Sequence, residues 1–509
     1  MKKSILFLLL LFIKPYGLFS HGEKKPIEPS DIRVNSQHIP ATTYGVNKPV
    51  NSQNFDIDSI ITDLRKFIPE FLKDRNVPGV GISIVSNGQV VFTDGFGYAN
   101  SITKVPVTAN TLFEVASISK VFTAYISLRL VDEGKLSLNK SLFSYLSKEW
   151  MPYSIYQDSI KLNHVLSHSS GLNKITREIM FKPGSAYFYS ANGFNLVKDV
   201  MEEVTGETLE ELAQRLVFQP LGMKNSSFVL KDELLPVTAN GHIHAIVPVI
   251  LFGAMFLVLY FIIYLVGLLI SRLLTKSWKL RTIYITVFII LSSVIVVCTL
   301  FILLGKSSLG EFATITVIAG LTALIVFLIL FFFSRLLIRR FVYKKVYQRI
   351  LYSFTGLLFI VIILFISMKV INLPVPSRSD YKPSAAGTLR TSPGELALFM
   401  IEIANPKFLK AETAELLRTP QIKLDENLSW GMGPGIFYSE QGYALWQWGQ
   451  HIDFQSIMIV YPESNSGVVV CTNNDLLNPD VALEIAQHIL GGNLESIQSA
   501  IHLRYDYRK

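Results

Sequence analysis

Cysteine is almost absent from this chain of 509 residues, which has only two. Cys298 lies inside a long apolar run and Cys471 in a short strand-like one, so a disulfide between them is not expected. No CxxC-type cluster exists that would hold a structural metal. The chemistry of the protein is therefore sought among other side chains, and we expect neither a metal nor an organic cofactor.

Charged residues are also scarce, at 17% of the chain against 50% hydrophobic residues. This composition is too apolar for a purely soluble protein and predicts membrane segments. Each of four apolar stretches is long enough to cross about 30 Å of hydrocarbon. The stretches run roughly over residues 245–270, 282–304, 312–334 and 350–368.

Acidic residues are missing from the first and third connectors between these stretches, whereas basic residues are frequent there. The basic residues are Arg272, Lys276, Lys279, Arg281, Arg335, Arg339, Arg340, Lys344, Lys345 and Arg349. By the positive-inside rule both connectors face the cytoplasm, which places the rest of the chain outside. These ten charges exceed the formal net charge of +8, so the basic balance reflects membrane topology. We therefore expect a lipid bilayer as a partner and no nucleic acid.

The remaining pattern indicates one domain that the membrane block interrupts. Residues 80–100 read as two strands joined at Asn87 and Gly88, which is a strong hairpin signal. A helix capped near Thr391 or Ser392 follows the block. Later strands are expected at 444–449, 455–461 and 467–472, and a closing helix at about 480–490. Early and late strands are expected to share one sheet.

The expected domain boundaries follow from these shifts in composition. The chain divides into a signal peptide with two lysines and a short apolar run (1–22), a polar leader (23–53), the first part of the domain (54–243), four transmembrane helices (244–372), the second part of the domain (373–495) and a C-terminal tail (496–509).

In the apolar run 113–130, Ser117 and Lys120 lie three residues apart near the start of an expected helix, so both project from one face. A serine attacks carbonyls poorly unless a base takes its proton, and a lysine of pKa about 10.4 serves only if burial or a nearby cation lowers that value. Only Ser117 begins a long apolar helix. The same spacing recurs in polar or proline-flanked connections at Ser101/Lys104, Ser137/Lys140 and Ser379/Lys382.

Several ordered blocks of the chain resemble the serine β-lactamase-like family, which includes class C β-lactamases, penicillin-binding proteins, esterases and D-amino-acid peptidases. The blocks include VPGVGISIV from Val77, FEVASISKVFTA from Phe113, LNHVLSHSSGL from Leu162, KPGSAYFYSANGF from Lys182 and AAGTLRTSPGEL from Ala385. The resemblance covers roughly residues 55–240 and 375–492. It implies an α+β fold, an antiparallel sheet flanked by helices with a helical subdomain, here interrupted by an α-helical transmembrane bundle.

The resemblance implies that Tyr189 is the tyrosine of a Tyr-x-Asn motif and takes part in proton transfer. Its alternative is a core tyrosine in an aromatic cluster. Ala191 stands where such enzymes have asparagine, and alanine cannot hydrogen-bond a substrate amide. Asn192 either substitutes as a substrate-binding residue or is a turn residue. The histidines His164 and His168 resemble a structural segment and receive no catalytic role.

The third motif of the family falls on Gln447, Trp448 and Gly449, which we assign to substrate binding. Glutamine replaces the usual cation, which argues against substrates of the penicillin kind because their carboxylate would lack its partner. His451 lies nearby and either compensates for the missing cation or is structural.

The resemblance implies acyl transfer on a small ester, amide or peptide. Ser117 attacks a carbonyl, Lys120 and Tyr189 move its proton, and the backbone amides of Ser117 and Gln450 form the oxyanion hole. One alternative is a degenerate receptor or regulator that binds a cell-wall fragment or β-lactam and signals through the spans. Another is a transport or lipid-handling role for the spans. We expect a multi-pass protein of the bacterial cytoplasmic membrane with an extracytoplasmic, periplasmic hydrolase domain.

Overall fold

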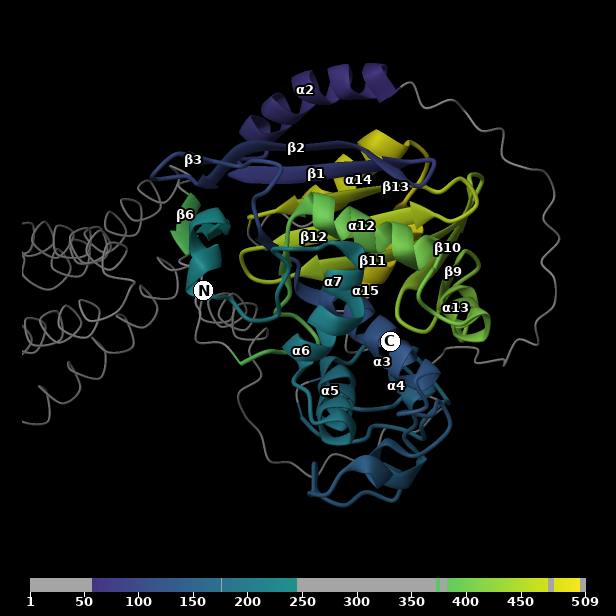
Figure 1. The fold of residues 1–509 in the computed structure, drawn as a ribbon. Helices are drawn as coiled ribbons and strands as arrows, with labels where there is room; N and C mark the ends of the chain where they lie inside the picture. Colours follow the sequence, from purple (N-terminus) through teal and green to yellow (C-terminus); the bar gives the residue numbers. More distant parts are fainter. Residues whose placement is uncertain (1–56, 175, 245–371, 376–381, 475–479, 504–509) are drawn as a thin grey trace, which may run out of the picture.

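A sheet of nine antiparallel strands forms the centre of the molecule (Figure 1). The computed structural model describes residues 57–174, 176–244, 372–375, 382–474 and 480–503. The strand order is β3-β2-β1-β13-β12-β11-β10-β9-β8. The strands are β1 (Gly79–Ser86), β2 (Gln89–Asn100), β3 (Val105–Pro106), β8 (Ile422–Lys423), β9 (Leu428–Trp430), β10 (Gly435–Ser439), β11 (Gly442–Gln450), β12 (Gln455–Tyr461) and β13 (Ser466–Thr472).

The hairpin between β1 and β2 turns at Asn87 and Gly88, as the sequence predicts. Both residues have positive φ, at 51° and 73°. Asparagine and glycine are the residues that adopt this left-handed backbone most readily, which explains the turn.

Strand β1 also pairs with β13, from Val80 opposite Thr472 to Val85 opposite Gly467. The prediction that early and late strands share one sheet is therefore confirmed. Every residue of β12 and β13 is buried, since helices cover both faces of the central strands. Cys471 on β13 is a buried free thiol.

Helices pack on both faces of this sheet. Helix α12, whose N-cap is Ser392 as expected, lies across the face that is nearer the viewer in Figure 1. Helices α2, α14 and α15 share a hydrophobic core with the opposite face. Their bounds are α2 (Ile57–Asp74), α12 (Pro393–Ala404), α14 (Val481–Leu490) and α15 (Glu495–Leu503).

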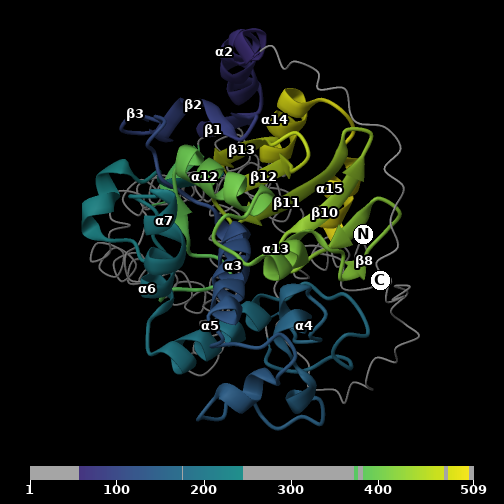
Figure 2. The same cartoon turned by 45° about the vertical axis from the view of Figure 1, so that its right-hand side comes forward.

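A helical region extends from one end of the sheet, and α3 runs from the sheet into it (Figure 2). This arrangement buries α3 on nearly all sides. The other elements outside the large sheet are η2 (Ala116–Ile118), α3 (Ser119–Asp132), η3 (Leu142–Tyr145), η4 (Gln157–Ser159), α4 (Leu162–Leu166), α5 (Ala191–Thr205), α6 (Leu209–Ala213), the π-helical turn η5 (Gln214–Phe218), α7 (Gln219–Leu221), η6 (Asp232–Val237) and α13 (Ala411–Arg418).

Two short ribbons complete the described part of the chain. Strand β4 (Phe113–Glu114) pairs with β7 (Arg390–Thr391), and β5 (Gly241–His244) pairs with β6 (Asn372–Val375). Because β5 and β6 are paired, His244 and Asn372, the described residues on either side of segment 245–371, lie opposite each other.

The four apolar stretches, Cys298, the signal peptide and the polar leader lie outside the described residues. Within the described ranges, no helix combines the length and hydropathy that a membrane crossing needs.

Candidate active site

Ser117 lies in the tight turn that leads into α3. The preceding residue, Ala116, has φ of 46°, in the left-handed region that side chains with a Cβ seldom adopt. Ser117 is the second residue of the 3-10 turn η2, and the first N–H groups of a helix have no intrahelical acceptor. The turn therefore presents both the hydroxyl and the N–H of Ser117 at the start of the helix.

Lys120 lies one turn later, beside Ser117. Its Nζ is 2.9 Å from Ser117 Oγ and also donates to the carbonyl oxygen of Ala386 at 2.9 Å. Both side chains are buried, at 5% exposure for Ser117 and 2% for Lys120. Burial disfavours the charged form of an amine, and a lysine must be neutral to act as a base. The predicted Ser-x-x-Lys pair therefore has the geometry of a nucleophile and its base.

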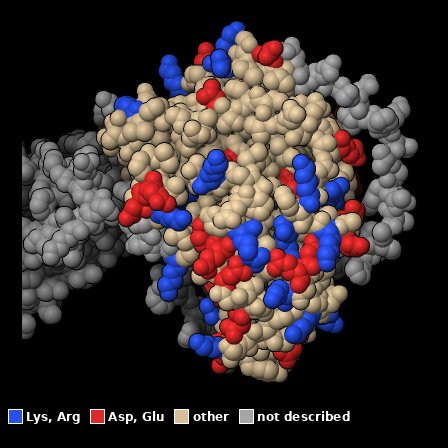
Figure 3. Space-filling view, in the orientation of Figure 1, with Lys and Arg blue, Asp and Glu red and all other residues tan. Residues whose placement is uncertain are grey.

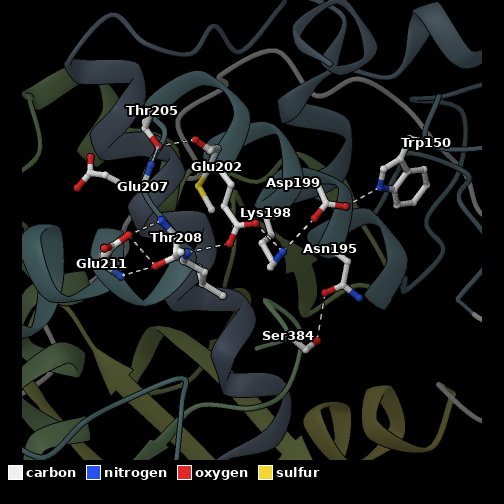
Figure 4. Close-up of polar contacts among 12 residues, drawn as sticks. Trp150, Asn195, Lys198, Asp199, Glu202, Thr205, Glu207, Thr208, Glu211 and Ser384 are labelled. Carbon is white, nitrogen blue, oxygen red and sulfur yellow. Dashed lines mark hydrogen bonds and ion pairs between the residues drawn. The ribbon is translucent and has the colours of Figure 1, made fainter. Parts of the chain in front are cut away.

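The loop that presents Ala386 is tied to two helices. Ser384 Oγ accepts from the Ala386 N–H and donates to Asn195 Oδ1 on α5 at 3.1 Å (Figure 4). Thr123 on α3 donates to the Ala385 carbonyl oxygen at 2.9 Å. The carbonyl that receives the Lys120 amine is thus held from two sides, a feature that sequence reasoning missed.

Tyr189 lies beside Lys120, immediately before the N-cap Ser190 of α5. The centre of its ring is 5.0 Å from Lys120 Nζ, and its hydroxyl accepts from Gln447 Nε2 at 3.3 Å. The structure therefore brings together Ser117, Lys120 and Tyr189, the three residues predicted to be catalytic.

Gln447 on β11 contacts Tyr189 at the tyrosine hydroxyl. Its Nε2 also donates to the Trp448 carbonyl oxygen at 3.0 Å, which fixes the orientation of the amide because a carbonyl can only accept. The residue is fully buried, and among the described residues Oε1 has no hydrogen-bond partner. The Trp448 ring lies 5.1 Å from that of Tyr189. Two of the predicted substrate-binding residues thus contact the predicted catalytic tyrosine.

Gly449 allows β11 to pass very close to the turn before Ser117. A Cβ at this position would lie 2.0 Å from the carbonyl oxygen of Val115, which also accepts from Ser456 Oγ at 2.9 Å. No side chain fits this gap. Gly449 therefore has a packing role that brings β11 against the nucleophile turn.

The next residue, Gln450, ends β11 opposite Gln455 of β12. It follows directly on Gly449, where β11 comes closest to the turn before Ser117. The oxyanion role of the Gln450 N–H stays a prediction.

The Asn192 side chain binds the backbone of the preceding loop. Its Nδ2 donates to the carbonyl oxygens of Asn173 and Thr176, at 2.8 and 2.9 Å, and so holds the preceding loop against α5. Of the two alternatives for this residue, these contacts favour a structural one, because both N–H groups of the amide are engaged with backbone.

A polar cluster beside the nucleophile turn was not identified from the sequence. Glu114 pairs with both Arg390 and His451 through its two carboxylate oxygens. Burial by itself would raise the pKa of Glu114, but the hydrogen bond and charge of His451, together with those of Arg390, outweigh it and lower the pKa. His451 is therefore anchored at one ring nitrogen. Its nearness to Gln447 in sequence was the only available signal.

The other Ser-x-x-Lys pairs differ from this site. Lys140 is exposed and lies over the Tyr145 ring at 4.0 Å, and Lys104 is exposed over the Tyr98 ring. Ser379 lies outside the described residues. Burial thus distinguishes Ser117 and Lys120, as the context predicted.

Charges of both signs are interspersed over the helical region on the face that Figure 3 shows, and most of the surface over the sheet is uncharged. On this face, the described residues form no continuous basic stripe of the kind that follows a nucleic-acid backbone.

Comparison with known proteins finds a family model and curated relatives that match part of the chain. Residues 64–255 match the family model for β-lactamase. The chain is 30% identical over 185 residues to Protein flp of Staphylococcus aureus (strain N315), an alignment covering 32% of this chain and 37% of the relative. It is 26% identical over 191 residues to a D-aminopeptidase of Gluconobacter oxydans (strain 621H), covering 32% and 35%. The chain thus aligns with about a third of the length of these curated relatives.

Solved structures extend the likeness of the fold. EstCE1, described as a hydrolase with promiscuous acyltransferase activity, superposes with a TM-score of 0.54 at 14% identity, covering 86% of this chain and 99% of that one. The fold is therefore the β-lactamase/transpeptidase-like α+β fold. The comparisons support the corresponding family of serine hydrolases, whose members include esterases, amidases and peptidases.

Proposed function

We propose that this protein is a membrane-anchored serine hydrolase that forms an acyl-enzyme through Ser117, Lys120 and Tyr189. The observation that carries the proposal is the buried contact of 2.9 Å between Ser117 Oγ and Lys120 Nζ, with Tyr189 against the same amine. A buried amine beside a hydroxyl at the start of a helix suits an activated nucleophile.

In the proposed mechanism, neutral Lys120 takes the Ser117 proton as Oγ attacks the carbonyl carbon of the substrate. The carbonyl oxygen becomes an oxyanion that the N–H groups of Ser117 and Gln450 stabilise. Tyr189 passes the proton to the leaving oxygen or nitrogen as that bond breaks. Water then attacks the acyl-enzyme ester, and its proton returns to Ser117 by the same route.

The substrate class that fits the site is an ester, amide or peptide without an essential carboxylate at the position of Gln447. A buried neutral amide cannot neutralise a carboxylate as a lysine would. The D-aminopeptidase among the relatives supports inclusion of D-amino-acyl amides in a screen.

The location of the enzyme is part of this proposal. The apolar stretches within 245–371 would anchor the protein in the cytoplasmic membrane, with the hydrolase domain on the extracytoplasmic side. The pairing of β5 with β6 supports this, because a segment with an even number of crossings returns to the side that it left.

The test is covalent labelling of the full-length protein with a fluorophosphonate probe, followed by intact mass. We expect one adduct on wild type and none on Ser117→Ala. Ser137→Ala is the matched control, because Ser137 has the same spacing to a lysine but is exposed. An unlabelled wild type with a cooperative unfolding transition would refute the hydrolase.

The second candidate is a receptor that binds without turnover. The neutral Gln447 and the engagement of Asn192 with backbone favour it, because both remove polar groups from substrate recognition. The same labelling separates the two, since a receptor has no need of an activated Ser117.

A further inference from the structure

Tyr189 lies in a stretch, residues 186–190, that belongs to neither a helix nor a strand. No regular ladder of backbone hydrogen bonds therefore fixes its position. The bonds on both sides of it go to a single residue. Phe188 donates its N–H to the carbonyl oxygen of His168 at 2.7 Å, and Ser190 donates its N–H to His168 Nδ1 at 3.2 Å.

The ring of His168 also stacks on the ring of Tyr189, with 4.2 Å between the centres and an angle of 30° between the planes. One residue thus holds the backbone before Tyr189, the backbone after it and one face of its ring. Phe194 and Trp430 surround the imidazole, and the residue is 1% exposed. The imidazole therefore has little freedom to move, and neither does the tyrosine that it contacts.

The protonation state of His168 follows from these contacts. A backbone N–H can only donate, so Nδ1 must be the unprotonated nitrogen and Nε2 carries the hydrogen. Complete burial, the largest cause, holds the pKa of His168 well below its usual range. His168 therefore remains a neutral acceptor, and its protonation would cost the bond to Ser190.

The backbone of His168 is also specialised. Its φ of 55° lies in the left-handed region, which among residues with a Cβ is tolerated best by Asn, Asp and His. Asparagine keeps both this backbone and a neutral acceptor near the place of Nδ1.

We infer that His168 is a positioning residue that fixes Tyr189 against Lys120. This inference rests on the proposed function. It assigns a positioning role to a histidine that the resemblance places in a structural segment. A displacement of a reacting group by about 1 Å costs up to about 10²-fold in rate. Loss of the His168 contacts should therefore lower turnover more than substrate binding.

The experiment measures hydrolysis of p-nitrophenyl acetate by the full-length protein. His168→Phe keeps an aromatic ring against Tyr189 but removes the acceptor, and we expect kcat to fall about 10- to 100-fold while KM changes less than about threefold. His168→Asn restores the acceptor, and we expect kcat within about threefold of wild type.

The matched control is His164→Phe, in the same segment. His164 accepts from the Lys161 N–H and contacts Gly184, so it supports α4 and not Tyr189. Its replacement should leave kcat within about twofold. Thermal unfolding of each variant shows whether it remains folded.

A double-mutant cycle tests whether His168 acts through Tyr189. In a Tyr189→Phe background, His168→Phe should lower kcat further by less than about twofold, because the group that it positions is gone. Additive losses, or an equal loss in His168→Asn and His168→Phe, would overturn the inference. If His168→Phe does not fold, comparison of His168→Asn with wild type decides, and a tenfold loss there overturns it.

Fluorophosphonate labelling separates the two levels of the argument. An unlabelled wild type removes the proposed function and this inference together. A labelled wild type with unchanged kcat in folded His168→Phe removes only the inference.

Discussion

The two sides of the Ser117 site are both buried, but only one of them holds an amine that can take up a proton. On the side of α3 and the loop after Ser384, the Lys120 amine contacts Ser117 Oγ and the Ala386 carbonyl. On the side of β11, a neutral amide, Gln447, approaches the Tyr189 hydroxyl. Proton transfer needs a group that titrates, whereas recognition needs only a complementary surface. Under the proposed function, acyl transfer by Ser117 is therefore compatible with a substrate that has no carboxylate at Gln447.

The two sides also differ in how well their polar groups are satisfied. Lys120 has two oxygen acceptors, whereas Gln447 Oε1 has no partner in the part of the chain that the structure describes. A buried polar atom without a partner costs about 1 to 3 kcal/mol of stability. The Gln447 amide is thus a local cost on the β11 side.

The largest expected effect concerns Lys120, on the α3 side of the site. In Lys120→Met no base remains beside Ser117, so we expect kcat for an activated ester to fall about 10²- to 10⁴-fold, the usual contribution of a positioned base. The measurement is hydrolysis of p-nitrophenyl acetate by the full-length protein.

Lys140→Met is the matched control, because Lys140 has the same spacing from a serine but is exposed. Its activity should stay within about twofold of wild type. Activity of Lys120→Met within tenfold of wild type would mean that another group is the base.

A smaller effect is expected for Gln447, on the β11 side of the site. Gln447→Met has a similar shape and removes the donor to Tyr189, so we expect kcat to fall about three- to tenfold, the worth of one hydrogen bond. Stability should change by less than about 1 kcal/mol, because the unpartnered Oε1 disappears as well.

Urea unfolding and ester hydrolysis check both parts of the Gln447 prediction. A loss of activity as large as that of Lys120→Met would contradict the distinction between the two sides.

Local sequence patterns made much of the fold predictable, and also the contact between Ser117 and Lys120. Asn87 and Gly88 define a turn through their own backbone preferences, and Ser392 caps its helix through the nearby N–H of Glu395. Ser117 and Lys120 meet because a helix brings positions three apart to one face. Each of these signals is contained in a few neighbouring residues.

The missed contacts join residues that are far apart in the chain. Ala386, which receives Lys120, is 266 positions away, and His451 is 337 positions from Glu114. No local periodicity encodes such a pair, because the sheet and the packing of the loops bring the partners together. Asn192 shows the complementary problem, since an asparagine suits a substrate or a loop equally well until its partners are known.

The smallest expected effect concerns Asp453, in the turn after β11. Asp453 packs against Gly241 of β5, where a Cβ would lie 2.0 Å from Oδ2. Burial, and then the charge of Glu114, raise the pKa of Asp453 from 3.8 to about 6. The folded state therefore binds this proton more tightly than the unfolded state, and stability is lost as the pH rises through 6.

Asp453→Asn removes this loss, so we expect the variant to be more stable than wild type by about 1 to 2 kcal/mol at pH 8, after allowance for solvent screening. The advantage should vanish below about pH 4, where both states of wild type are protonated. Glu114→Gln should show the opposite sign, because the pKa of Glu114 is lowered and its contribution is present above the ordinary glutamate pKa and lost as the pH falls. Urea midpoints at pH 4 and 8 measure both. An Asp453→Asn advantage that is equal at the two values would mean that the carboxyl group does not titrate differently on folding, and that the turn after β11 is as well solvated as the unfolded chain.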